Sequence, residues 1–217
     1  IIGGLERLGL DPEDIRYVVI SHAHGDHIGG AQILQERYGA QVVMGGADWE
    51  LVESYPNRYS TMAPSRDIVA TDGMELTLGN TTLTIWETPG HTLGTLSYTF
   101  TVFDDGRPVN VAYSGGTAFN FVNSTPDPGI ENFQSYIDAQ QHIAEQAAAT
   151  GASVLLSNHS EFDNAFNRNR MLAGRGDGPH PYELGEDWVQ RYFQVMQGCA
   201  RAAQLRLEQE RAEAGVL

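Results

Sequence analysis

Three histidines and one aspartate lie within six residues in the segment Ser21-His22-Ala23-His24-Gly25-Asp26-His27. Neutral imidazole and carboxylate are both ligands of zinc in proteins. The first two histidines are two residues apart after an apolar run, where a strand directs both side chains to one face. The glycine that follows permits a turn that brings the aspartate and the third histidine close. Four ligands in one loop predict a metal site, and indicate two ions, because one tetrahedral zinc with a water needs only three.

Two more histidines occupy the same kind of position. His91 lies in the turn Thr88-Pro89-Gly90-His91-Thr92, directly after a predicted strand. His159 lies in Ser157-Asn158-His159, directly after the last predicted strand. Three strand-end loops that supply five histidines and an aspartate favour one shared metal site over isolated polar residues.

The other histidines and the single cysteine are not expected at this site. His142 lies inside a predicted helix and His180 in a Gly-Pro loop, where a role other than metal binding is the better interpretation. Cys199 has no partner for an internal disulfide, so cysteine usage leaves the cellular compartment open. We expect Cys199 to be a small buried apolar residue.

The composition and net charge of the chain indicate which class of partner it can bind. The chain has 217 residues, 41% of them hydrophobic, which suits one globular domain over residues 1–217. It carries 13 basic and 28 acidic residues, for a net charge of −15, and this surface should repel the phosphates of nucleic acids. No apolar run approaches the roughly 18 residues of a membrane helix. The expected partner is a small-molecule substrate, with no nucleic acid and no membrane; the oligomeric state is left open.

The hydrophobic pattern predicts the elements that position these ligands. Strands at 17–20 and 41–44 alternate with helices at 31–38 and 48–55, which indicates a parallel sheet with crossover helices. Two hairpins are predicted next, from strands 74–78 with 81–86 and 95–103 with 109–113. A helix at 131–149, a strand at 153–157, a glycine- and arginine-rich loop at 164–181 with some helix at its start, and a long helix at 186–214 complete the chain.

These motifs resemble the metallo-β-lactamase superfamily in their order and spacing. The matching segments are His22 to His27, Thr88 to Thr92 and Ser157 to His159. The resemblance implies an α/β fold, the αβ/βα four-layer sandwich of two mixed sheets with outer helices, with metal bound at the sheet edge. Members usually have a strand pair and a helix before the first motif, and only 21 residues precede it here. We therefore expect a single domain that lacks its N-terminal part.

The resemblance also assigns the metal ligands, as two groups of three for two zinc ions. The ligands of the first zinc would be His22, His24 and His91. The ligands of the second zinc would be Asp26, His27 and His159.

One expected ligand is missing. Most hydrolases of the superfamily have an aspartate that bridges both metals, in a segment that matches Tyr113-Ser114-Gly115-Gly116-Thr117 here. Gly115 or Gly116 takes its place. This pattern is similar to the third subclass of zinc β-lactamases, which has a three-histidine site, an Asp-His-His site and no bridging Asp or Cys. Serines of this loop help to hold the substrate carboxylate in that subclass, so Ser114 and Thr117 are the expected substrate-binding residues.

The resemblance implies a zinc-dependent hydrolase that uses a metal-bound hydroxide to open the amide of β-lactam rings, an activity that gives antibiotic resistance. Asp26 would orient the nucleophile or accept its proton. One alternative is the same di-zinc fold acting on another ester, lactone or thioester, although most such enzymes keep the bridging aspartate. A second alternative is a non-catalytic metal-binding protein. Antibiotic-degrading members act in the periplasm, but this sequence does not give the compartment.

Overall fold

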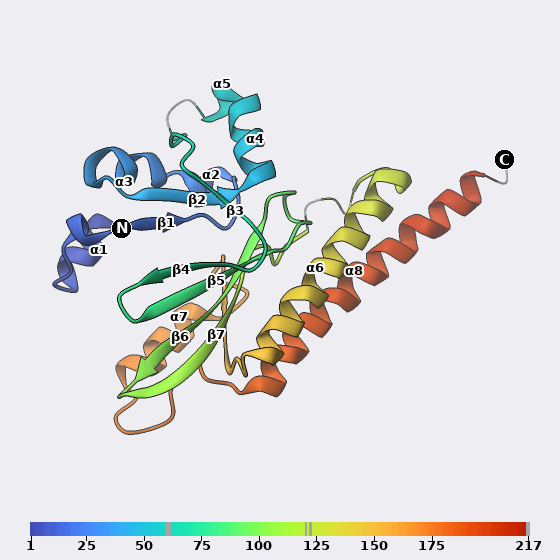
Figure 1. The fold of residues 1–217 in the computed structure, drawn as a ribbon. Helices are drawn as coiled ribbons and strands as arrows, with labels where there is room; N and C mark the ends of the chain where they lie inside the picture. Colours follow the sequence, from blue (N-terminus) through green and yellow to red (C-terminus); the bar gives the residue numbers. More distant parts are fainter. Residues whose placement is uncertain (60–61, 120, 122, 216–217) are drawn as a thin grey trace.

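The computed structural model describes residues 1–59, 62–119, 121 and 123–215 of the chain. Its elements form four layers, with two β-sheets face to face and helices on both outer sides (Figure 1). The predicted four-layer α/β sandwich is therefore confirmed. None of the described helices combines the length and the apolar character needed to cross a membrane.

The smaller sheet contains three short strands, β1 (Tyr17–Val19), β2 (Gln41–Gly45) and β3 (Ile68–Ala70). They lie in the order β1-β2-β3, and both pairings are parallel. The strand β2 is central, and four of its five residues are buried because it has the helices on one face and the larger sheet on the other. The sequence pattern predicts β1 and β2 but misses β3, which has only three residues.

Short helices cover the outer face of the smaller sheet. Residues of α2, α3, α4 and α5 pack with Val42 and Met44 of β2. The helix predicted at 31–38 has those bounds in the structure. The helices of this half are α1 (Ile2–Arg7), a 3-10 turn η1 (Pro12–Asp14), α2 (Gly25–Ile28), α3 (Ala31–Tyr38), α4 (Gly46–Ser54) and α5 (Pro56–Tyr59).

The larger sheet is mixed. Its strands are β4 (Met74–Leu78), β5 (Thr81–Glu87), β6 (Leu96–Asp104), β7 (Arg107–Ser114) and β8 (Val154–Ser157), in that spatial order. The first three pairings are antiparallel and the pairing of β7 with β8 is parallel. Both predicted hairpins are confirmed. The second turn is shorter than predicted, because Asp104 pairs with Arg107 and the positive φ angles of Asp105 and Gly106 form a two-residue turn.

Two long antiparallel helices cover the outer face of the larger sheet, α6 (Pro126–Ala149) and α8 (Glu186–Ala214) (Figure 1). The bounds of α8 are as predicted, whereas α6 begins five residues earlier than predicted, where Pro126 suits the first turn of a helix. The loop predicted at 164–181 contains α7 (Ala165–Ala173) near its start.

Cys199 is exposed, so the prediction that it is buried is wrong. The buried residues Phe193, Ala200 and Leu207 repeat every seven positions along α8. Cys199 lies about 100° around the helix from Ala200, outside this buried stripe.

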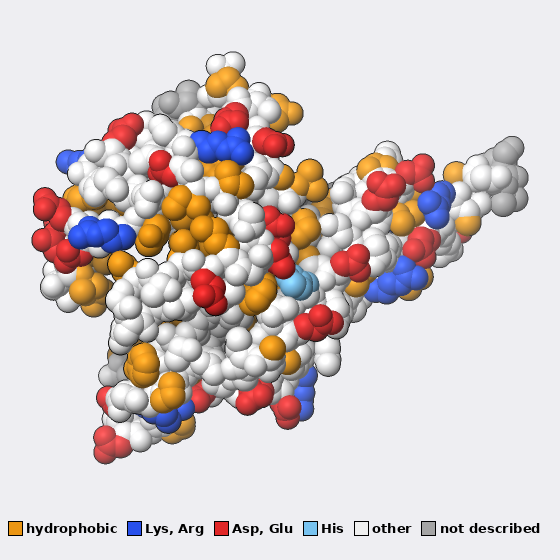
Figure 2. Space-filling model, in the orientation of Figure 1, with side chains coloured by type: hydrophobic (Ala, Val, Ile, Leu, Met, Phe, Trp, Pro, Cys, Tyr) orange, Lys and Arg blue, Asp and Glu red, His pale blue; other side chains and the backbone are white. Residues whose placement is uncertain are grey.

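A shallow apolar groove lies between the edge strands β1 and β4, where the two sheets diverge. It has a volume of about 260 Å³ and is lined by Tyr17, Val19, Leu76, Leu78, Thr81 and Leu83. Figure 2 shows hydrophobic side chains gathered between the two sheets on this face, with acidic side chains spread around them. The groove belongs to the inter-sheet core and is separate from the histidine cluster.

Candidate metal centre

Strand direction brings the predicted ligand loops to one edge of the larger sheet. The strands β5, β7 and β8 run in the same direction, since β5 and β7 are both antiparallel to β6 and β8 is parallel to β7. His91 follows β5, the segment 115–117 follows β7, and His159 follows β8. The loop after β1 joins this edge through the hydrogen bond from Leu96 N to Ser21 O, at 2.8 Å. The topology therefore places all three histidine-bearing loops together.

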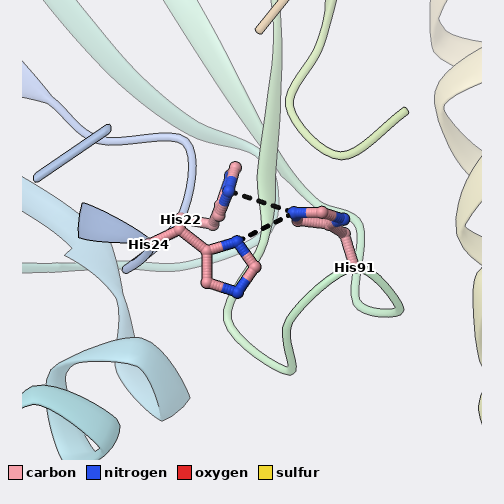
Figure 3. Close-up of side chains that lie close together, drawn as sticks. All are labelled: His22, His24 and His91. Atoms are coloured by element: carbon pink, nitrogen blue, oxygen red, sulfur yellow. Dashed lines mark hydrogen bonds between the residues drawn. The ribbon is translucent and has the colours of Figure 1, made fainter. Parts of the chain in front are cut away.

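The first three ligands converge on one point, as Figure 3 shows. The Nε2 atom of His91 lies 3.1 Å from Nε2 of His22 and 3.1 Å from Nδ1 of His24. Ligand nitrogens around a tetrahedral zinc with bonds of 2.0–2.1 Å are about 3.3 Å apart. These three rings are therefore close to the arrangement that one zinc ion requires.

The second group has the same compact form. The Nε2 atoms of His27 and His159 are 3.2 Å apart, and Oδ2 of Asp26 lies 3.3 Å from the first and 3.5 Å from the second. Asp26 and His27 come from α2, a single turn of helix that starts at Gly25. The turn predicted at this glycine thus takes the form of a short helix that directs both side chains toward His159.

Burial lowers the pKa of three of the histidine rings, His22, His27 and His91, and so favours their neutral form. The pKa of His22 is lowered to about 2, first by burial and then by the neighbouring His91, His27 and His24. Burial also lowers the pKa of His27 and of His91. A neutral imidazole has a free nitrogen lone pair, which a metal ion needs and a protonated ring lacks.

Backbone carbonyls orient two of these rings. The Nδ1–H of His22 donates to the carbonyl of Gly115 at 3.0 Å, and the Nδ1–H of His91 donates to the carbonyl of Ala118. Each bond selects the tautomer whose free Nε2 lone pair points to the other histidines, the usual arrangement of metal-binding histidine. The two donor sets, three imidazole nitrogens and two nitrogens with a carboxylate, both fit zinc.

No side chain fits at the position of the bridging aspartate. A Cβ atom on Gly115 would lie 1.7 Å from the carbonyl oxygen of Leu96. A Cβ atom on Gly116 would lie 2.6 Å from Cβ of His91 and 2.9 Å from Cγ2 of Thr95. Neither glycine can therefore carry a carboxylate without a shift of the backbone, and packing explains the glycines.

The predicted substrate-binding hydroxyls are buried. Ser114 is 1% exposed and Thr117 is 2% exposed. The hydroxyl of Thr117 lies 2.6 Å from the Tyr192 hydroxyl, 2.7 Å from Ser157 Oγ and 3.3 Å from Ser114 Oγ. These four side chains form a hydroxyl cluster behind the metal centre, so a substrate would reach Ser114 or Thr117 only if they left these partners. Their role in substrate binding stays a prediction.

Sequence reasoning missed Tyr192 and one further residue near the centre, the buried Asp48 of α4. Tyr192 is more than thirty residues from any ligand and carries no motif, so no local signal could have found it. His142 and His180 lie in neither triad. His142 contacts Asp72, with Nε2 2.9 Å from Oδ1.

Residues 1–102 match the family model described as the metallo-beta-lactamase superfamily. Curated relatives include hydroxyacylglutathione hydrolases. The protein from Rhodopseudomonas palustris (strain BisA53) is 33% identical over 120 residues, which are 55% of this chain and 39% of the relative. The protein from Pseudomonas putida (strain GB-1) is 31% identical over 102 residues, 47% of this chain and 33% of the relative. The match thus spans well under half the length of these relatives.

Solved structures match over nearly the whole chain. BJP-1, a subclass B3 metallo-beta-lactamase of Bradyrhizobium japonicum, superposes with a TM-score of 0.76 at 25% identity, over 96% of this chain and 79% of that one. Native FEZ-1 metallo-beta-lactamase from Legionella gormanii has a TM-score of 0.77 at 22% identity, over 95% of this chain and 80% of that one. The sequence matches and the structural matches thus indicate the same superfamily. The relatives named by the first are hydroxyacylglutathione hydrolases, and those named by the second are β-lactamases.

Proposed function

The chain carries a metallo-β-lactamase superfamily domain, and from this premise we propose that it is a di-zinc hydrolase that opens the amide of β-lactam rings. The His22-His24-His91 triad would hold one zinc ion and the Asp26-His27-His159 triad the other. Zinc, when bound, lowers the pKa of a coordinated water to about 7 and polarises a carbonyl oxygen.

The side chains of the protein would supply the metal ligands and the group that orients the attacking water. His22 and His91, whose pKa values are lowered by burial, offer free Nε2 lone pairs to the first site. The side chain of Asp26 is 61% exposed, so its carboxylate can reach both a metal ion and a water molecule at the solvent side. In this position Asp26 orients the attacking water or accepts its proton.

The observation that carries the β-lactam proposal is the absence of space for a side chain at Gly115 and Gly116. The family resemblance implies that most superfamily hydrolases of esters and thioesters keep a bridging aspartate, whereas the third subclass of zinc β-lactamases lacks it. A likeness to β-lactamase structures over 95–96% of the chain supports the same assignment.

Thioester hydrolysis is the second candidate, favoured by the relatives named hydroxyacylglutathione hydrolase. Their similarity is confined to about half of this chain. Both reactions would use the same two triads, and they differ in the electrophile and in the substrate groups around it.

Parallel assays separate the candidates. The zinc-loaded chain is mixed with a chromogenic cephalosporin and, separately, with a 2-hydroxyacyl thioester of glutathione, each with and without a chelator. We expect cephalosporin hydrolysis that the chelator and the substitution His24→Ala both abolish. Thioester turnover alone would replace the first candidate by the second. Zinc binding without either turnover would support the non-catalytic alternative.

A further inference from the structure

Asp48 is a buried carboxylate for which the proposed chemistry has no use. It lies in the first turn of α4 and is 1% exposed. Burial raises the pKa of its carboxyl group, so the site must offset the cost of a charge there. The N-terminus of a helix favours negative charge, and three hydrogen-bond donors surround the two carboxylate oxygens.

Those three donors come from the two loops that supply the first triad. The N–H of Ala23, the residue between His22 and His24, donates to Oδ2 of Asp48 at 2.7 Å. The hydroxyl of Thr92, which follows His91, donates to the same oxygen at 2.8 Å. One oxygen atom thus joins the two loops directly.

The turn after His91 is also held at Gly94. Its N–H donates to Oδ1 of Asp48 at 3.0 Å. The fit is close, since a Cβ atom on Gly94 would lie 2.5 Å from the backbone nitrogen of Asp48, and one on Gly45 would lie 2.2 Å from the carbonyl oxygen of Gly94. The backbone therefore has little freedom to move relative to the carboxylate.

The first loop is fixed from its other side by α5. The hydroxyl of Tyr59, which is 1% exposed, donates to the carbonyl of Ala23 at 2.8 Å. Side chains therefore hold both backbone polar groups of the residue between the two histidines. The spacing of the first triad thus depends on contacts outside its ligands.

We infer that Asp48 is a positioning residue that holds His22, His24 and His91 at the spacing required to share one metal ion. Among the described residues, its hydrogen bonds reach Ala23, Thr92 and Gly94, and none reaches Asp26, His27 or His159. The consequence is selective. Loss of Asp48 weakens the first metal site and leaves the second site intact.

The inference rests on the metal binding in the proposed function and is independent of the substrate. Its test is Co²⁺ titration followed by visible absorption, in two variants that each keep one triad. His159→Ala leaves only the first triad complete, and His24→Ala leaves only the second. Asp48→Asn keeps the shape of the side chain but replaces one carboxylate oxygen by an NH₂ group. This group is a donor and cannot accept the hydrogen bonds that Asp48 receives from Ala23, Thr92 or Gly94.

We expect Asp48→Asn to lower Co²⁺ affinity by about 10-fold in the His159→Ala protein, the lower end of the loss that follows removal of a direct partner of a metal ligand, because Asp48 acts through Ala23 and Thr92. Affinity should change less than twofold in the His24→Ala protein. Asp187→Asn is the matched control, because Asp187 is an exposed aspartate in the first turn of α8. It should leave Co²⁺ affinity unchanged in both proteins.

Thr92→Val provides a milder variant, which removes the hydroxyl bond to Asp48 and the contact with the Thr95 hydroxyl but keeps the bonds of Asp48 to Ala23 and Gly94, and it should weaken the first site alone. Equal losses of affinity in both backgrounds would mean a general structural effect and would overturn the inference. Unchanged affinity of the first site in both variants would overturn it too. Failure of the unmodified chain to bind Co²⁺ would instead reject the metal centre itself.

Discussion

The Nδ1 atom of His22 lies 3.0 Å from the carbonyl oxygen of Gly115, one of the two glycines predicted to replace a bridging aspartate. The loop after β7 therefore supports the metal centre through its backbone. This carbonyl orients a ligand of the first triad, and the residue that supplies it has no room for a side chain.

Replacing Gly115 by aspartate should not restore a bridging ligand. Because the new Cβ would lie 1.7 Å from the carbonyl oxygen of Leu96, the backbone must shift, and His22 loses its partner. We expect Gly115→Asp to lower the melting temperature and the zinc content together. Gly3→Asp is the control, since Gly3 is exposed with nothing within 4 Å of its added Cβ. A stable Gly115→Asp protein that binds zinc more tightly would contradict this reading of the packing.

Removal of one hydroxyl from the buried cluster should cost stability. Tyr192→Phe removes the hydrogen bond of 2.6 Å to the Thr117 hydroxyl, which keeps Ser157 and Ser114 as partners, so the expected loss is that of one hydrogen bond, about 0.5–1.5 kcal/mol. Denaturant unfolding of the metal-free chain measures this loss. Tyr55→Phe, at a residue 56% exposed, should change the free energy of unfolding by less than about 0.5 kcal/mol. Equal effects of the two substitutions would show that the cluster adds no stability.

Acid should destabilise the metal-free chain through His22. The pKa of this ring is lowered from 6.5 to about 2 in the folded state, so the unfolded chain binds the proton more readily. Stability is therefore lost as the pH falls below about 6.5, and the loss continues toward pH 2. We expect His22→Asn to reduce the pH dependence of the free energy of unfolding between pH 7.5 and 5.5. His142→Gln, outside both triads, is the control. An identical pH dependence in His22→Asn and the unmodified chain would rule out a depressed pKa.

The convergence of the five histidines and Asp26 could be predicted from the sequence because their loops each follow a strand. Apolar runs at 17–20 and 153–157 identify the strand ends, and the histidines there have no better explanation. The long helix at 186–214 was also predictable, since residues such as Val189, Phe193 and Leu207 recur at helical spacing along it, although its end is mostly polar.

The partners of the ligands could not be predicted in this way. Asp48 looks like an ordinary acidic residue in the first turn of a helix, and its contacts with Ala23 and Thr92 are more than twenty residues away along the chain. The contact of Tyr192 with Thr117 spans 75 positions. Such contacts depend on how the layers pack, which no local pattern encodes. The prediction that Cys199 is buried was wrong for a related reason, because residue type alone does not decide which side of α8 faces solvent.

Cys199 should react in the folded protein. It is the single cysteine of the chain and it is exposed on α8, so a maleimide reagent should modify one thiol per chain without denaturant. Zinc content should not change on labelling, because Cys199 belongs to neither triad. Mass spectrometry of the labelled protein checks the first point and metal analysis the second. Labelling only in denaturant would contradict the placement of this helix face.

The most direct test of the central claim is the number of zinc ions bound per chain, measured by atomic emission after dialysis against low zinc. Two triads predict two zinc ions in the unmodified chain, one in His24→Ala and one in His159→Ala. Absence of zinc from the unmodified chain, or a zinc content that these substitutions do not change, would contradict the two-metal centre.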